Sequence, residues 1–241
     1  MDTYDIFNLC AHMKSDIAIL EKKFNLFSKV TNYLNSNVIN GLSFSSIDTH
    51  NYQVEALSTN LSWHLDYWAS SDIKKLTNRL KVGIHLWEEF PNVYIKHFAL
   101  KSKRLLKYDV VSQHSSIYEI LSIDTSQPLS NEVLKNLVYQ KPKISHISRQ
   151  ILSGKKVNKK GVTFGHLYFT EKEWILINLL LQLKCVKEIA SIQCCSDALV
   201  RRRINSIKDK LNCSHQPLSS LFFNLKSQGI ISCHPPFIMS P

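Results

Sequence analysis

Glycine is scarce in this chain, which has 6 in 241 residues. Loops that wrap phosphate groups depend on glycine, because its backbone reaches conformations that other residues rarely adopt. The sequence has no glycine-rich phosphate loop, no Gly-x-Ser-x-Gly and no His-Glu-x-x-His. Its ten histidines stand apart from such motifs and are typical of structural or surface positions. We therefore expect no enzyme, no catalytic residue and no cofactor.

Long apolar runs are missing as well. No stretch approaches the ~18 apolar residues of a membrane span, and the N-terminus lacks a basic segment followed by an apolar run. The six cysteines form no secretory disulfide framework, and their spacing matches no standard zinc site. We expect a cytoplasmic protein with reduced thiols, no metal ion and no membrane partner.

What the chain does have is positive charge, with a formal net charge of +11. Residues 151–241 carry 13 basic and 5 acidic residues, whereas residues 1–150 are nearly balanced at 17 and 14. A positive field concentrated in the last third favours phosphate backbones as partners. Since 44% of the residues are hydrophobic and only 20% are charged, the chain can also build a packed core.

Periodicity in residues 1–152 predicts an α/β domain, in which a mainly antiparallel sheet is flanked by helices. Pro142 is expected to break or kink the last helix. The expected helices cover residues 5–34, 61–80, 93–107 and 129–152, and the expected strands cover 38–47, 52–58, 109–113 and 116–123.

Residues 153–166 differ in composition, with three of the six glycines and two Lys-Lys pairs. This composition predicts a flexible basic linker. A second, all-α domain is expected over residues 167–241, and the whole chain then has an α+β fold.

Four helices are expected in the second domain. Thr170 and Glu173 have the spacing of a capping box at the start of the first helix. A short helix is expected over 186–193, and Ser196 is placed to cap a third helix. Residues 217–228 have the pattern of a fourth helix.

The expected third helix has two distinct sides. Val200, Ile204, Ile207 and Leu211 follow helical spacing and form one apolar stripe. Arginine, asparagine and lysine side chains point away from that stripe. Arg binds guanine and Asn binds adenine in the major groove of DNA, while Lys mostly contacts phosphate. The sequence thus favours a DNA-reading helix over an ordinary solvated basic face.

Residues 169–211 resemble the C-terminal helix-turn-helix of LuxR-type transcriptional regulators. The family's Lys-Glu-Ile-Ala core stands unchanged at 187–190, and its Ser-Glu-x-Thr-Val-Lys turn appears as Ser-Asp-Ala-Leu-Val-Arg at 196–201. Its opening and its end are similar to residues 169–173 and 206–211. Leu183 stands where the family has a glycine, and Leu199 where it has a threonine.

The resemblance implies a homodimer that places two recognition helices in successive major grooves of double-stranded DNA. It also implies that the fourth helix serves dimerisation. Helical geometry and the resemblance together assign eight residues to DNA contact: Lys187, Ser196, Ala198, Arg201, Arg202, Asn205, Lys208 and Lys210.

The N-terminal half is only distantly similar to the autoinducer-binding domain of the quorum-sensing branch of that family. That branch has an aromatic-rich stretch, and residues 60–68 look like a drifted version of it. An α/β/α sandwich with a small-molecule site is implied, although plain aromatic core is the alternative. The candidate pocket residues are Trp63, Tyr67, Trp68 and Trp87.

The sequence therefore predicts a sequence-specific, DNA-binding transcription regulator that is controlled through its N-terminal domain. The alternative is a regulatory protein that acts mainly by protein contact, with a helix-turn-helix that no longer reads DNA. Salt dependence separates the two, because DNA binding weakens steeply with salt and apolar protein contact does not.

Overall fold

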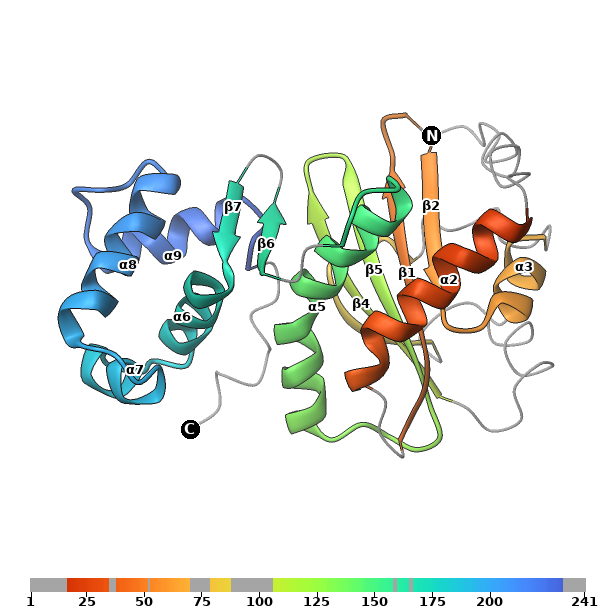
Figure 1. Ribbon diagram of the computed structural model, residues 1–241, viewed down its shortest axis with the longest axis horizontal. Helices are drawn as coiled ribbons and strands as arrows, with labels where there is room; N and C mark the ends of the chain where they lie inside the picture. Colours follow the sequence, from red (N-terminus) through yellow and green to blue (C-terminus); the bar gives the residue numbers. More distant parts are fainter. Residues whose placement is uncertain are drawn as a thin grey trace. The chain divides into compact units, whose positions relative to one another are not determined.

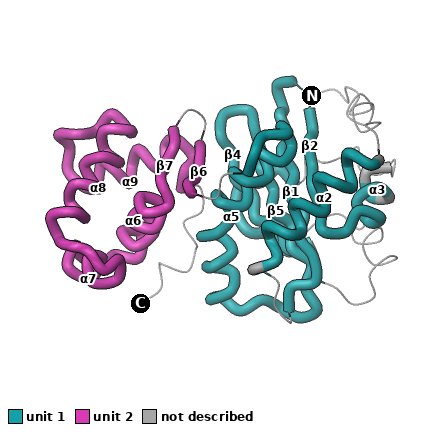
Figure 2. Tube along the Cα trace, viewed as in Figure 1, with its two compact units in different colours: residues 1–157, 232–241 teal, residues 158–231 magenta. Residues whose placement is uncertain are grey.

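The computed structural model describes residues 17–34, 38–51, 53–69, 79–87, 106–157, 160–164 and 167–231 (Figure 1). The chain divides into two compact units (Figure 2). Unit 1 comprises residues 1–157 and 232–241, and unit 2 comprises residues 158–231. No helix in the described ranges is long and apolar enough to cross a membrane.

A five-stranded antiparallel sheet forms the centre of unit 1, in the order β2-β1-β5-β4-β3. At the β1–β2 turn, the Asp48 carboxylate accepts hydrogen bonds from the backbone N–H groups of His50 and Asn51. The aspartate side chain thus closes the turn. The strands are β1 (Ile39–Asp48), β2 (Gln53–Ser58), β3 (Gly83–Leu86), β4 (Leu106–His114) and β5 (Ile117–Thr125).

Helices cover both faces of this sheet, because successive strand residues point to opposite sides. Val110 and Leu121 pack with α2 (Ile17–Thr31) and α5 (Asn131–Leu152) on one face. Val111 and Ile120 pack on the other face against aromatic residues of α3 (Leu61–Ala69). A short 3-10 turn, η1 (Asn32–Leu34), follows α2.

Several sequence-based boundaries in unit 1 are wrong. The helix expected over 93–107 cannot reach its end, since β4 begins at Leu106 and pairs with β5. The helix expected over 61–80 ends at Ala69, and β3 was not expected. Residues 5–16, 70–78 and 93–105 of the predicted helices lie outside the described ranges. Helix α5 continues through Pro142 and is not broken there.

Unit 2 begins with a hairpin of β6 (Gly161–Phe164) and β7 (Leu167–Thr170). Strand β6 lies inside the range expected to be a flexible linker, and β7 lies inside the domain expected to be all-α, so both predictions are wrong at these residues. Gly161 was counted as a sign of a flexible linker, but its role is to allow close packing of the two strands. A Cβ there would lie 2.5 Å from the Phe169 carbonyl oxygen and from the Tyr168 hydroxyl, so close strand packing requires glycine.

Four helices complete unit 2: α6 (Glu171–Leu181), α7 (Val186–Ile192), α8 (Asp197–Lys210) and α9 (Leu218–Ser227). Each is followed by a residue in the left-handed conformation, which turns the chain sharply. These residues are Leu183, Cys194, Asn212 and Gly229. The expected capping box is confirmed, with Thr170 and Glu173 as its two members.

Candidate functional site

The N-terminus of α8 is fixed by a side-chain cap. The Ser196 hydroxyl oxygen accepts a hydrogen bond from the Leu199 N–H at 3.3 Å, as expected from the sequence. Asp197 follows in the first turn, where negative charge stabilises the helix dipole. Because α7 ends at Ile192, only a short turn separates the two helices.

The apolar stripe of α8 is buried in the core of unit 2. Val200 and Ile207 are fully buried, and Ile204 and Leu211 are nearly so. They pack with Trp174 and other core residues of α6, α7 and α9. This burial fixes the rotation of α8 about its axis, and the opposite side must therefore face solvent.

Arg201, Arg202 and Asn205 lie on that solvent side and are exposed. We call these three residues the basic face of α8. Two guanidinium groups and one amide on successive turns offer planar pairs of hydrogen-bond donors, together with an amide acceptor. Such groups match the edges of guanine and adenine. Lys187, Ser196 and Ala198 are exposed as well.

The other cations of α8 are already engaged inside unit 2. The Arg203 guanidinium donates to the side-chain oxygen of Gln193 and lies 3.8 Å from Cys195 Sγ, so it braces the α7–α8 turn. Lys208 Nζ donates to the carbonyl oxygen of Gln216 at 2.5 Å. Lys210 Nζ lies 2.6 Å from Glu173 Oε2.

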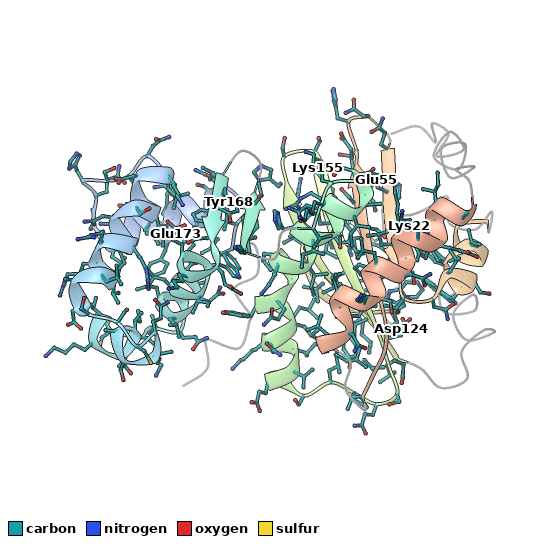
Figure 3. All side chains as sticks on the ribbon, viewed as in Figure 1. Lys22, Glu55, Asp124, Lys155, Tyr168 and Glu173 are labelled. Atoms are coloured by element: carbon teal, nitrogen blue, oxygen red, sulfur yellow. The ribbon has the colours of Figure 1, made fainter. Side chains whose placement is uncertain are left out.

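Glu173 joins α6 to α8 (Figure 3). Burial alone would raise the pKa of its carboxyl, but hydrogen bonds from Lys210, Thr170 and Ser206 together lower the pKa. Glu173 therefore remains ionised, and its contacts hold the two helices together. Lys210, which the sequence assigned to DNA contact, therefore has its charge balanced by the Glu173 carboxylate.

Leu183 takes the conformation that the expected glycine would have, with φ 60°, and its side chain is 82% exposed. Its N–H donates to the Leu180 carbonyl oxygen at 2.9 Å, so the turn after α6 is formed without glycine. A non-glycine residue in this region costs about 1 kcal/mol or more.

Leu183→Gly is therefore expected to stabilise unit 2, because it removes that strain and no buried contact. A gain of about 1 kcal/mol in the free energy of unfolding of unit 2 should appear in chemical denaturation. Leu181→Gly, which places the same residue inside α6, should destabilise instead. A loss of stability in Leu183→Gly would show that the turn is not strained.

Three of the four candidate pocket residues of unit 1 lie together in the structure. Trp63 and Tyr67 stack at 4.9 Å between ring centroids, and Trp87 lies 6.4 Å from Trp63 and 5.9 Å from Tyr67. All three are buried. We call them the aromatic box. The side chain of Trp68, the fourth candidate, lies outside the described residues.

Two buried cations lie against the aromatic box. The Arg79 guanidinium carbon lies 4.6 Å from the centre of the Trp87 ring, and Lys107 Nζ lies 3.7 Å from that of Trp63. Asp109 and Asp124 balance their charge, since Arg79 contacts Asp109 at 2.7 Å and Lys107 contacts Asp124 at 2.8 Å. The box is thus lined by a neutral set of four ionic side chains.

The sequence-based prediction missed these four residues. Lys107 was assigned to a helix end, although Lys107 and Asp109 in fact lie on the α3 side of β4 and alternate with Tyr108 and Val110, which pack on the α2 and α5 side. The available signal was the spacing of Lys107 and Asp109, because charged residues two apart in a strand lie on the same face of the sheet. Within the described ranges, no group of three or more His, Cys, Asp or Glu residues could hold a metal ion.

No protein-family model matches the chain, and no curated protein matches its sequence. Among solved structures, it is similar to SdiA in complex with octanoyl-rac-glycerol, with 14% identity, a TM-score of 0.36 and coverage of 97% of this chain and 100% of that chain. Escherichia coli SdiA in another crystal gives 14% identity, a TM-score of 0.38 and coverage of 94% and 99%. At these TM-scores the likeness carries no inference about the function of this chain.

Proposed function

We propose that this chain is a sequence-specific DNA-binding transcription regulator that acts as a homodimer. The basic face of α8 carries the proposal, because it presents Arg201, Arg202 and Asn205 to solvent from a helix whose other side is buried. A helix held in this way after a short turn has the form of a major-groove recognition helix. Unit 1 is then the regulatory or dimerisation domain.

Each assigned residue has a role that its position allows. Arg201 and Arg202 read guanine, and Asn205 reads adenine. Lys187 contacts backbone phosphate, and the exposed first turn with Ser196 and Ala198 lies closest to the groove floor. Lys208 and Lys210 have the weaker claim, since they already bind Gln216 and Glu173.

The proposal is tested with a mixed-sequence DNA duplex, because non-specific binding requires no knowledge of the operator. Fluorescence anisotropy should show affinity that falls steeply between about 50 and 200 mM salt, since counterions are released from each neutralised phosphate. Affinity that is absent, or that does not respond to salt, would contradict the proposal.

The second candidate is a function in protein contact, and exposed apolar side chains of unit 2 favour it. Phe223 on α9 is 72% exposed and Ile192 on α7 is 53% exposed. Leu221 and Leu225 of α9 are buried in the core of unit 2, and Phe223 lies on the opposite, outward side of the helix. In the proposed homodimer, this side of α9 faces the second copy.

Phe223→Ser is expected to weaken that dimer by about 2 kcal/mol or more, because a large aromatic group at an interface contributes strongly to affinity. Sedimentation equilibrium measures the change as a rise of about thirtyfold or more in the dimer dissociation constant. Ile192→Ser removes a similar apolar area from α7 and serves as the matched control. Equal effects of the two variants would remove α9 as the dimer contact.

A further inference from the structure

We infer that the aromatic box of unit 1 is occupied by the chain's own cations, Arg79 and Lys107, and that unit 1 therefore folds without a bound small molecule. This inference concerns unit 1 alone and holds whether or not unit 2 binds DNA. It replaces the external ligand of the sequence-based prediction by two side chains of the protein itself.

Arg79 donates hydrogen bonds to three buried side chains around the aromatic box. Its Nε donates to Asp109 Oδ2 at 2.8 Å, Nη1 donates to the Tyr67 hydroxyl at 2.5 Å, and Nη2 donates to Ser122 Oγ at 3.2 Å. The planar group also covers the face of Trp87. Only 4% of Arg79 is exposed, so this side chain fills the space between α3 and the sheet.

Lys107 occupies the other half of the box. Its ammonium group lies 3.7 Å from the centre of Trp63 and 4.9 Å from that of Trp87, and Asp124 balances its charge. Asp124 is labelled in Figure 3. Aromatic faces attract cations most strongly where water is excluded, and Lys107 is only 1% exposed. Both indole faces of the box thus already have cationic partners.

An incoming ligand would have to displace this arrangement. An acyl chain that pushed Arg79 aside would leave Asp109 as a buried charge without its counterion, which is strongly unfavourable, and one that displaced Lys107 would leave the partly buried Asp124 unpaired. The four charges sum to zero and are joined by direct contacts, so the unit needs no external group to neutralise them. The aromatic box therefore stabilises unit 1 as it stands.

The test removes the internal cation and returns it as a small molecule. In the full chain, Arg79→Ala should lower the midpoint of thermal unfolding of unit 1 by about 10 °C. Methylguanidinium at low millimolar concentration should then raise that midpoint, relative to the same concentration of sodium chloride. Wild type should not respond. Arg149→Ala is the matched control, because it breaks the ion pair with Glu119 on the opposite face of the sheet.

Rescue of Arg79→Ala alone supports the inference, and equal responses of both variants or of neither overturn it. If Arg79→Ala does not fold, Arg79→Lys takes its place: because lysine keeps the charge but loses the paired donors, this variant should fold with a midpoint below that of wild type, and an unchanged midpoint would overturn the inference. The wild-type chain gives an independent readout. Native mass spectrometry should show its bare mass, and octanoyl-rac-glycerol should leave its unfolding midpoint unchanged. A stoichiometric adduct, or a saturating rise in that midpoint, would overturn the inference.

Discussion

Replacing both Arg201 and Arg202 by alanine is expected to weaken binding to the operator by about 2–6 kcal/mol, with about 1–3 kcal/mol from each arginine that reads a base. Both side chains are exposed, and neither helps to bury the apolar stripe of α8. The stability of unit 2 should therefore remain within about 0.5 kcal/mol of wild type. Anisotropy titration and thermal unfolding measure the two quantities.

The matched control is the double variant Lys155→Ala/Lys156→Ala, which removes two adjacent exposed positive charges from unit 1. This variant should weaken binding only by reducing the long-range attraction between the protein and the DNA phosphates, and the loss should be equal for all DNA sequences. Arg201→Lys separates charge from shape, because lysine keeps the charge but loses the paired donors. Similar losses in both double variants would show that charge alone binds DNA.

Unit 1 is expected to lose about 2 kcal/mol of stability between pH 7 and pH 5, because of His64. Burial, with a smaller contribution from the charge of Lys107, lowers the pKa of this imidazole from 6.5 to about 3. Below pH 6.5 the unfolded chain therefore binds a proton that the folded chain does not. Stability is fully present above pH 6.5 and falls as pH decreases towards the folded pKa, by up to ~1.4 kcal/mol per pH unit.

Urea denaturation in a Trp174→Phe background isolates the tryptophan signal of unit 1. His64→Phe keeps a ring against Phe24, which now meets His64 edge-on at 4.9 Å between centroids, and should remove most of this pH dependence. His114→Phe is the control, because His114 is exposed and its replacement should leave the dependence unchanged. A His64→Phe chain that still loses 2 kcal/mol by pH 5 would show that another group titrates.

The helices of unit 2 were predictable because their signals are local. Caps, apolar spacing and charge at Thr170, Glu173 and Ser196 act within a few residues of the helix ends that they fix. The outward side of α8 followed from the positions of Val200, Ile204 and Ile207 alone. Leu183 was harder to interpret, since nothing local indicates that leucine will adopt a left-handed turn.

Features that depend on distant residues were not predictable. Strand β3 exists through its pairing with β4, and Leu106 and Lys107 are strand residues through their pairing with β5. Gly161 belongs to a strand because Phe169 and Tyr168 pack against it. The contacts of Arg79 were not predictable for the same reason, because its partners Asp109 and Ser122 are 30 and 43 residues away in the sequence. Only the folded chain brings such groups together.

Selection of binding sites from a random duplex library tests most directly whether α8 reads DNA. The full wild-type chain should enrich a two-fold symmetric site, with half-sites separated by about one helical turn or a multiple of it. Guanine and adenine should dominate the contacted positions, and the Arg201→Ala/Arg202→Ala chain should lose the guanine preference. A library that stays random after repeated rounds with wild type would contradict the account.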